Sequence, residues 1–131
     1  MSYLVDTNVI SELAKPNPNS GVAAWAQTVT GISLSVITLE EISYGLSWKP
    51  NPRVQAWFDE FFASSCTICP VVEEVAIRAG QIRGQMAKRG RRRTQADMLI
   101  AATAQLYQLT LVTRNTRDFD ECGIALLDPF S

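Results

Sequence analysis

The sequence predicts one α/β domain, residues 1–131, in which a mostly parallel sheet of about five strands lies between two layers of helices (three-layer α/β/α). The 131 residues are enough for one good core but not for two. Apolar residues make up 47% and charged residues 19% of the chain, as in an ordinary globular domain. Short apolar runs alternate with helical patterns along the whole chain. This alternation is typical of parallel strands joined by helical crossovers.

The first half of the chain begins with a short apolar strand that stops at Asp6. Asp6 or Thr7 can cap the helix that follows, and Pro16 and Pro18 end it. A second helix runs up to Gly31, and alternating apolar and polar residues then indicate a strand. In order, the predicted elements are a strand at 3–5, a helix with apolar Val9, Ile10 and Leu13, a helix from Asn19 or Ser20 with apolar Val22, Trp25, Ala26 and Val29, and a strand at 32–36.

The rest of the chain continues the alternation. Residues 38–41 have the form of a capping box that opens a helix through Ile42 and Leu46. After Gly90 and a basic segment, Thr94 caps a further helix. The other predicted elements are a helix with apolar Val54, Trp57, Phe58, Phe61 and Phe62, a strand at 66–71, a helix with apolar Val75, Ile77, Ala79, Ile82 and Met86, a helix from Met98 to Leu106, and strands at 109–113 and 124–127.

The composition excludes several classes of function. The chain has no histidine, which excludes His-based triads, His general bases and zinc sites built on imidazole. The apolar run at residues 1–5 is too short for a signal peptide, and the uncharged stretch 16–39 is too polar to span a membrane. We expect Cys66, Cys69 and Cys122 to be reduced core residues of a cytoplasmic protein.

Acidic and amide side chains gather at one edge of the predicted sheet. Asp6 ends the first strand, Glu41 and Asp97 each begin a helix, and Asn115 and Asp118 follow a later strand. Strand ends and the starts of crossover helices meet at this edge, where ligands bind in such folds. Each acid alone is better explained as an ordinary cap. Together they repel one another unless a cation neutralises them, and an oxygen-only donor set favours Mg²⁺ or Mn²⁺.

Four segments of the chain resemble those of the PIN-domain ribonucleases, most of all the VapC and FitB-like toxins of bacterial toxin–antitoxin pairs. The segments are Leu4-Val5-Asp6-Thr7-Asn8, Ser35 to Ile42 followed by Tyr44-Gly45, Ala96-Asp97-Met98-Leu99-Ile100-Ala101-Ala102, and Leu111 to Phe119. They occur in the order of that family and cover essentially the whole chain.

The resemblance implies a metal-dependent endoribonuclease that acts as the toxin of such a pair. Asp6, Glu41 and Asp97 match the three catalytic, metal-binding carboxylates of the family. Asn115 takes a fourth position that is often aspartate in relatives, and Asp118 is a further candidate ligand. The implied reaction is hydrolysis of an RNA phosphodiester by a water that Mg²⁺ or Mn²⁺ activates, leaving 5′-phosphate and 3′-hydroxyl ends. The resemblance also implies a homodimer and a cognate antitoxin.

A basic run precedes the helix that carries Asp97. Residues 88–93 contain five of the twelve basic residues, a pattern that is often only a solvated loop. Its place beside the acidic edge makes Arg91, Arg92 and Arg93, together with Arg114, candidates for contacts with RNA phosphates.

One alternative function stays open at this point: a catalytically weak PIN-like module that binds RNA or a protein. Only Asn115, where relatives often have an acid, favours it. A phosphoaspartyl phosphatase is disfavoured because Asn8 replaces the second acid of its motif. The apolar residues at 42–46 and 57–62 are more than a small domain needs for its core, so we expect part of them to form an interface.

Overall fold

The protein is described by a computed structural model, which places residues 2–64 and 66–131. In these residues the chain forms a five-stranded parallel sheet of order β3-β2-β1-β4-β5. The strands are β1 (Tyr3–Val5), β2 (Ile32–Ser35), β3 (Cys66–Cys69), β4 (Thr110–Val112) and β5 (Leu126–Leu127). The predicted domain, residues 1–131, includes Met1 and Ser65, which lie outside the described residues.

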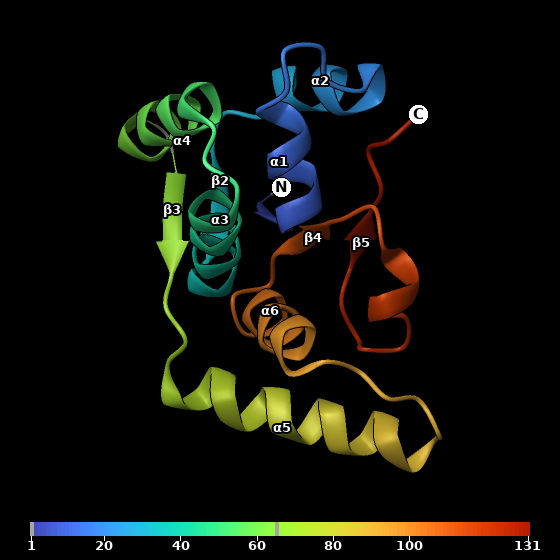
Figure 1. Ribbon diagram of the computed structural model, residues 1–131. Coiled ribbons are helices and arrows are strands. Elements are labelled where there is room, and N and C mark those ends of the chain that lie inside the picture. The colour runs from blue at the N-terminus through green and yellow to red at the C-terminus, as the bar shows by residue number, and fades with distance from the viewer. Residues whose placement is uncertain (1, 65) are drawn as a thin grey trace.

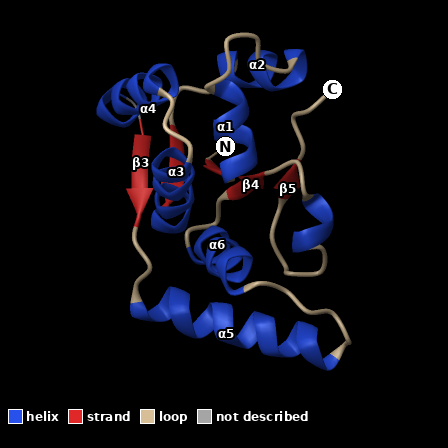
Figure 2. Cartoon of the chain, in the orientation of Figure 1, coloured by secondary structure: helices blue, strands red, loops and turns tan. Residues whose placement is uncertain are grey.

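Helices connect the strands and cover the sheet (Figures 1 and 2). They are α1 (Thr7–Leu13), α2 (Ser20–Gln27), α3 (Val36–Trp48), α4 (Pro52–Ser64), α5 (Glu73–Lys88) and α6 (Gln95–Leu106), with a 3₁₀ helix, η1 (Thr116–Phe119). Figure 1 shows α5 packed below α6, at the opposite end of the view from α2 and α4. None of the helices in the described part of the chain is long and apolar enough to cross a membrane.

The sheet separates two apolar cores. Leu4 and Leu111 point to the core that contains residues of α5 and α6, such as Met98. Val5 and Val112, the next residue of each strand, point to the core that contains residues of α1 to α4. Successive side chains of a strand alternate between its two faces, so β1 and β4 are buried on both sides. The predicted three-layer α/β/α class is confirmed.

The beginning of α3 differs from the prediction. The helix starts at Val36, directly after β2, and its cap is Ser35, whose hydroxyl accepts a hydrogen bond from the backbone N–H of Ile37 (3.0 Å). Thr38, the predicted cap, is buried inside the helix. The prediction of a capping box at 38–41 is therefore wrong, because a hydroxyl residue closer to the strand satisfies the first free amides.

Two strand ends and one short element also differ. β3 ends at Cys69, two residues early, because Pro70 cannot donate to a sheet ladder. The last strand is limited to Leu126 and Leu127, and η1 was not predicted. η1 follows β4 and carries Asp118.

Candidate active site

The candidate site lies where β1 and β4 end side by side. Val5 pairs with Val112 in the parallel ladder, so the next residues, Asp6 and Thr113, are neighbours. The backbone N–H of Asp6 donates to the carbonyl of Val112 (2.9 Å). Asp6 is also the N-cap of α1, as predicted. The register of the sheet thus places a carboxylate and a hydroxyl together at its carboxyl edge.

Asp6 is held rigidly and is almost fully buried, with 7% exposure. Its Oδ1 accepts from the backbone N–H of Thr7 (2.8 Å), and its Oδ2 accepts from the Thr113 hydroxyl (2.8 Å) and the Asn8 amide (3.3 Å). Burial raises the pKa of Asp6; the bonds from Thr113, Thr7 and Asn8 oppose the rise, and the charge of Asp118 adds to it. The net rise means that these neighbours do not fully compensate the buried charge.

Thr7 connects Asp6 to Glu41. Its hydroxyl donates to Oε1 of Glu41 (2.6 Å), while its backbone N–H donates to Asp6. Glu41 is half-buried and lies in α3, 34 residues away in sequence. One threonine therefore orients carboxylates from two separate elements.

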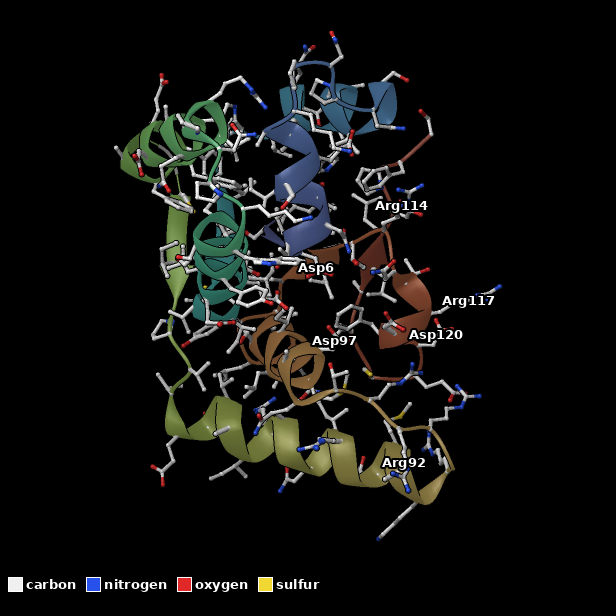
Figure 3. The ribbon with its side chains drawn as sticks, viewed as in Figure 1. Asp6, Arg92, Asp97, Arg114, Arg117 and Asp120 are labelled. Carbon is white, nitrogen blue, oxygen red and sulfur yellow. The ribbon has the colours of Figure 1, made fainter. Side chains whose placement is uncertain are left out.

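Asp97 approaches from α6. The hydroxyl of Thr94, the N-cap of α6, accepts from the backbone N–H of Asp97 (3.1 Å), as predicted. Burial raises the pKa of Asp97; a bond from Thr94 opposes the rise, and the charges of Asp6, Asp118 and Glu41 add to it. Figure 3 shows Asp6 and Asp97 extending from their two elements beside η1. The predicted acids are therefore within electrostatic range of one another.

Asn115 and Asp118 flank this group from the segment after β4. The backbone N–H of Asn115 donates to the Thr113 hydroxyl (3.1 Å), and the backbone N–H of Asp118 donates to the carbonyl of Asn115 (3.0 Å). Both side chains are exposed. The charge of Asp118 reaches Asp6 and Asp97, whose pKa values it helps to raise, whereas Asn115 brings no charge.

These side chains fit a divalent cation that keeps several of its waters better than one that is coordinated by protein atoms alone. Among the described residues, no three side chains of the acidic, histidine or cysteine type converge closely enough to hold an ion directly. The carboxylates nevertheless repel one another and raise the pKa values of Asp6 and Asp97. Mg²⁺ keeps several of its waters and needs only one or two direct carboxylates. The assignment of individual ligands stays a prediction.

The predicted RNA-binding arginines have different surroundings. Arg92 is exposed and projects from the loop between α5 and α6, far from Asp6 in the view of Figure 3. Arg91 pairs with Glu121 (2.6 Å). The guanidinium of Arg114 lies 4.6 Å from the centre of the Phe130 ring. These three remain candidates for phosphate contacts.

Two residues that the sequence analysis gave no role in the site, Thr7 and Asn8, support it directly. Besides bonding to Asp6, the Asn8 side chain accepts from the backbone N–H of Arg114 (3.1 Å) and lies 3.3 Å from the Thr113 hydroxyl. The signal for both was present, since a hydroxyl and an amide residue directly follow an acid at a buried strand end.

Comparison with known proteins gives the family. Residues 3–124 match the PIN domain. The chain is 35% identical to toxin FitB of Neisseria gonorrhoeae over 97% of both chains. It is 29% identical to the tRNA(fMet)-specific endonuclease VapC of Shigella flexneri over 94% of this chain and 93% of that protein. The crystal structure of FitAcB from N. gonorrhoeae matches with a TM-score of 0.84, at 35% identity over 97% of both chains. The chain therefore belongs to the PIN domain family.

Proposed function

We propose that this protein is a Mg²⁺- or Mn²⁺-dependent endoribonuclease that acts as the toxin of a toxin–antitoxin pair. The observation that carries the proposal is that Thr7 bonds to both Asp6 and Glu41, while burial and then the charges of Asp6 and Glu41, among others, raise the pKa of Asp97. The relatives add support, because one is named a toxin and another a tRNA-specific endonuclease.

The three carboxylates have the main role in holding the cation. Asp6 is fixed by Thr113, Thr7 and Asn8, so it offers its remaining lone pairs in one orientation. Thr7 fixes Glu41 in the same way. Asp97 completes the set from α6, and Asn115 and Asp118 serve as outer ligands or as acceptors for waters of the ion.

A bound Mg²⁺ or Mn²⁺ would make water a better nucleophile and neutralise charge on the scissile phosphate. The chain itself offers few other routes, since it has no histidine for acid–base catalysis. The raised pKa values of Asp6 and Asp97 also favour a bound cation. A carboxylate without a positive charge nearby is stabilised more by a divalent ion than one already paired with arginine.

Arg91, Arg92 and Arg114 are the proposed contacts to RNA phosphates. Arg92 and Arg114 are exposed, and Arg91 can exchange its partner Glu121 for a phosphate at small cost because both side chains are about half exposed. The segment 128–130 supports Arg114 through its contact with Phe130.

The proposed protein partners are a cognate antitoxin and a second copy of this chain. Solved relatives include the FitAcB complex and a DNA-bound VapBC complex from Salmonella typhimurium, the latter with a TM-score of 0.82 at 28% identity over 98% of both chains. Of the apolar residues expected to form an interface in part, Ile42 and Phe58 are buried and Tyr44 is 63% exposed; Trp48, just beyond the expected range on α3, is 66% exposed. This aromatic pair, with centroids 6.2 Å apart, is the part of α3 best suited to an interface.

The three cysteines are free thiols, in keeping with the predicted cytoplasmic location.

The test is cleavage of single-stranded and hairpin RNA by the purified chain with Mg²⁺, with Mn²⁺ and with EDTA. We expect cleavage with either metal, none with EDTA, and none from Asp97→Asn. RNA binding without cleavage under every condition would contradict the proposal and favour the alternative of a catalytically weak binding module.

A further inference from the structure

The basic loop between α5 and α6 does not form one uniform phosphate-binding surface. Arg92 is exposed, and Figure 3 shows it near the carboxyl end of α5. Arg91 lies on the surface, paired with Glu121, with 47% of its side chain accessible. Both side chains are therefore available to a ligand in solution.

Arg93 has the opposite orientation and is engaged by the protein. Its Nη1 donates to the carbonyl of Arg117 (2.8 Å), and its Nη2 donates to the carbonyl of Asp120 (3.4 Å). Its Nε is covered and, within the described residues, has no hydrogen-bond partner. A covered, unpaired N–H is costly, so this guanidinium has lost part of its hydration to reach those carbonyls.

One carbonyl belongs to Arg117, within η1, and the other to Asp120, the residue that follows this helix. η1 is only four residues long, and at its carboxyl end the bond from the N–H of Asp120 to the carbonyl of Arg117 is 3.4 Å long. A cation at the carbonyl end of a helix is favourable because unpaired carbonyls there carry partial negative charge. Arg93 thus adds side-chain bonds to this short helix and to the residue that follows it.

Arg93 connects η1 to α6, the helix that carries Asp97. Arg93 directly precedes Thr94, the N-cap of α6, and Asp97 follows in the first turn. Asp118 is on η1, which packs against α6, the helix that carries Asp97. Like charges on Asp97 and Asp118 repel each other when no cation lies between them, and this repulsion tends to move η1 away from α6. Bonds from Arg93 to η1 oppose that displacement.

We propose that Arg93 is a positioning residue of the site: its guanidinium holds η1, and with it Asp118, beside Asp97, and it does not contact RNA. The inference rests on the proposed function, and it replaces the phosphate-binding role that the charge pattern predicts for Arg93. Arg91 and Arg92 keep that role.

The first experiment measures Mn²⁺ affinity without RNA, by calorimetry, for the full chain and three variants. We expect Arg93→Ala to weaken Mn²⁺ binding about tenfold, which corresponds to about 1.4 kcal/mol. Arg93→Lys should weaken Mn²⁺ binding less than Arg93→Ala does, because an ammonium group can bond to one carbonyl but lacks the planar guanidinium that bonds to both. Arg92→Ala is the matched control: it removes the same charge from the same loop and should leave Mn²⁺ affinity unchanged.

A double-mutant cycle then distinguishes a positioning role of Arg93 from a general loss of structure. If Arg93 acts through Asp118, Arg93→Ala should weaken Mn²⁺ binding much less when Asp118 is already alanine. Equal weakening in both backgrounds would overturn the inference. If Arg93→Ala fails to fold, the same cycle with Arg93→Lys carries the test, and no coupling there would equally overturn it.

RNA binding in EDTA gives an independent readout. Arg92→Ala should reduce the dependence of RNA affinity on salt, and Arg93→Ala should leave it as in the parent. An equal reduction by both variants would make Arg93 a phosphate contact and overturn the inference, as would a parent chain that binds no Mn²⁺. A parent that binds Mn²⁺ but cleaves no RNA would instead remove the proposed function alone.

Discussion

Replacing Thr113 with valine removes a hydrogen bond to the buried Asp6 carboxylate with little change in shape. Thr113 is fully buried, and its hydroxyl donates to Asp6 at 2.8 Å. A hydrogen bond to a charged group contributes about 1.5–3 kcal/mol. For a chain of 131 residues, a loss of that size lowers the melting temperature by about 5–11 °C. The backbone N–H of Asn115 also loses its acceptor, so the upper part of the range is expected.

The loss of stability should depend on pH in a defined direction. The Thr113 hydroxyl favours the charged form of Asp6 and thus lowers the pKa of Asp6, against the larger raising effect of burial. Thr113→Val therefore raises the pKa of Asp6 further. The charge-dependent part of its cost is full at pH values above the variant's pKa and is lost as the pH falls below the pKa of Asp6 in the parent. The difference in unfolding free energy between Thr113→Val and the parent should be larger at pH 7 than at pH 3.

Thermal unfolding in EDTA, followed by circular dichroism from pH 3 to pH 8, measures this difference. Thr113→Ser is the control: it keeps the hydroxyl, loses one methyl group, and should cost about 1 kcal/mol at every pH. Cleavage by Thr113→Val should fall about tenfold to a hundredfold because Asp6 is less well oriented. A cost of Thr113→Val that is independent of pH, or equal to that of Thr113→Ser, would refute the view that Thr113 stabilises the charged Asp6.

Three further predictions concern the acids and the basic loop. Asp97→Asn should abolish Mn²⁺-dependent cleavage. Because the folded chain raises the pKa of Asp97, the same variant should have a higher melting temperature than the parent in EDTA at pH 7, and this gain should vanish below about pH 3.9. A lower melting temperature at pH 7 would contradict the assignment of Asp97 to the site. Asn115→Asp should lower the Mn²⁺ concentration for half-maximal cleavage, and Asp118→Ala should raise it; superimposable titrations would show that three carboxylates suffice. Arg92→Ala should reduce the slope of log affinity for single-stranded RNA against log salt by about 0.7, measured by fluorescence anisotropy in EDTA; an unchanged slope would make Arg92 an ordinary solvated residue.

The sequence was sufficient for the fold class because apolar periodicity reports burial directly. Alternation along 32–36 and the helical spacing of the apolar residues after Val75 identified a strand and a helix. The exact start of α3 was missed because Ser35 and Thr38 are both good caps, and only the geometry of the turn after β2 selects between them. η1 is too short for any periodicity to indicate it.

The candidate site was predictable in part for the same kind of reason. Residues that follow parallel strands and residues that begin the crossover helices meet at one edge, so Asp6 and Asp97 could both be assigned to it without knowing the order of the strands. The bond from Thr7 to Glu41 spans 34 residues, and no local pattern encodes such a contact. The inward orientation of Arg93 was missed because a run of like charges does not show which side chain turns toward the protein.

If the carboxylate edge directs hydrolysis of RNA by a water and a divalent cation, the chemistry of the RNA ends left by cleavage with Mn²⁺ reports it. Mass spectrometry of the RNA fragments identifies these ends. We expect 5′-phosphate and 3′-hydroxyl ends, and no fragments from Asp6→Asn. Ends with a 2′,3′-cyclic phosphate and a 5′-hydroxyl, formed equally well in EDTA or by Asp6→Asn, would contradict metal-dependent hydrolysis at this site.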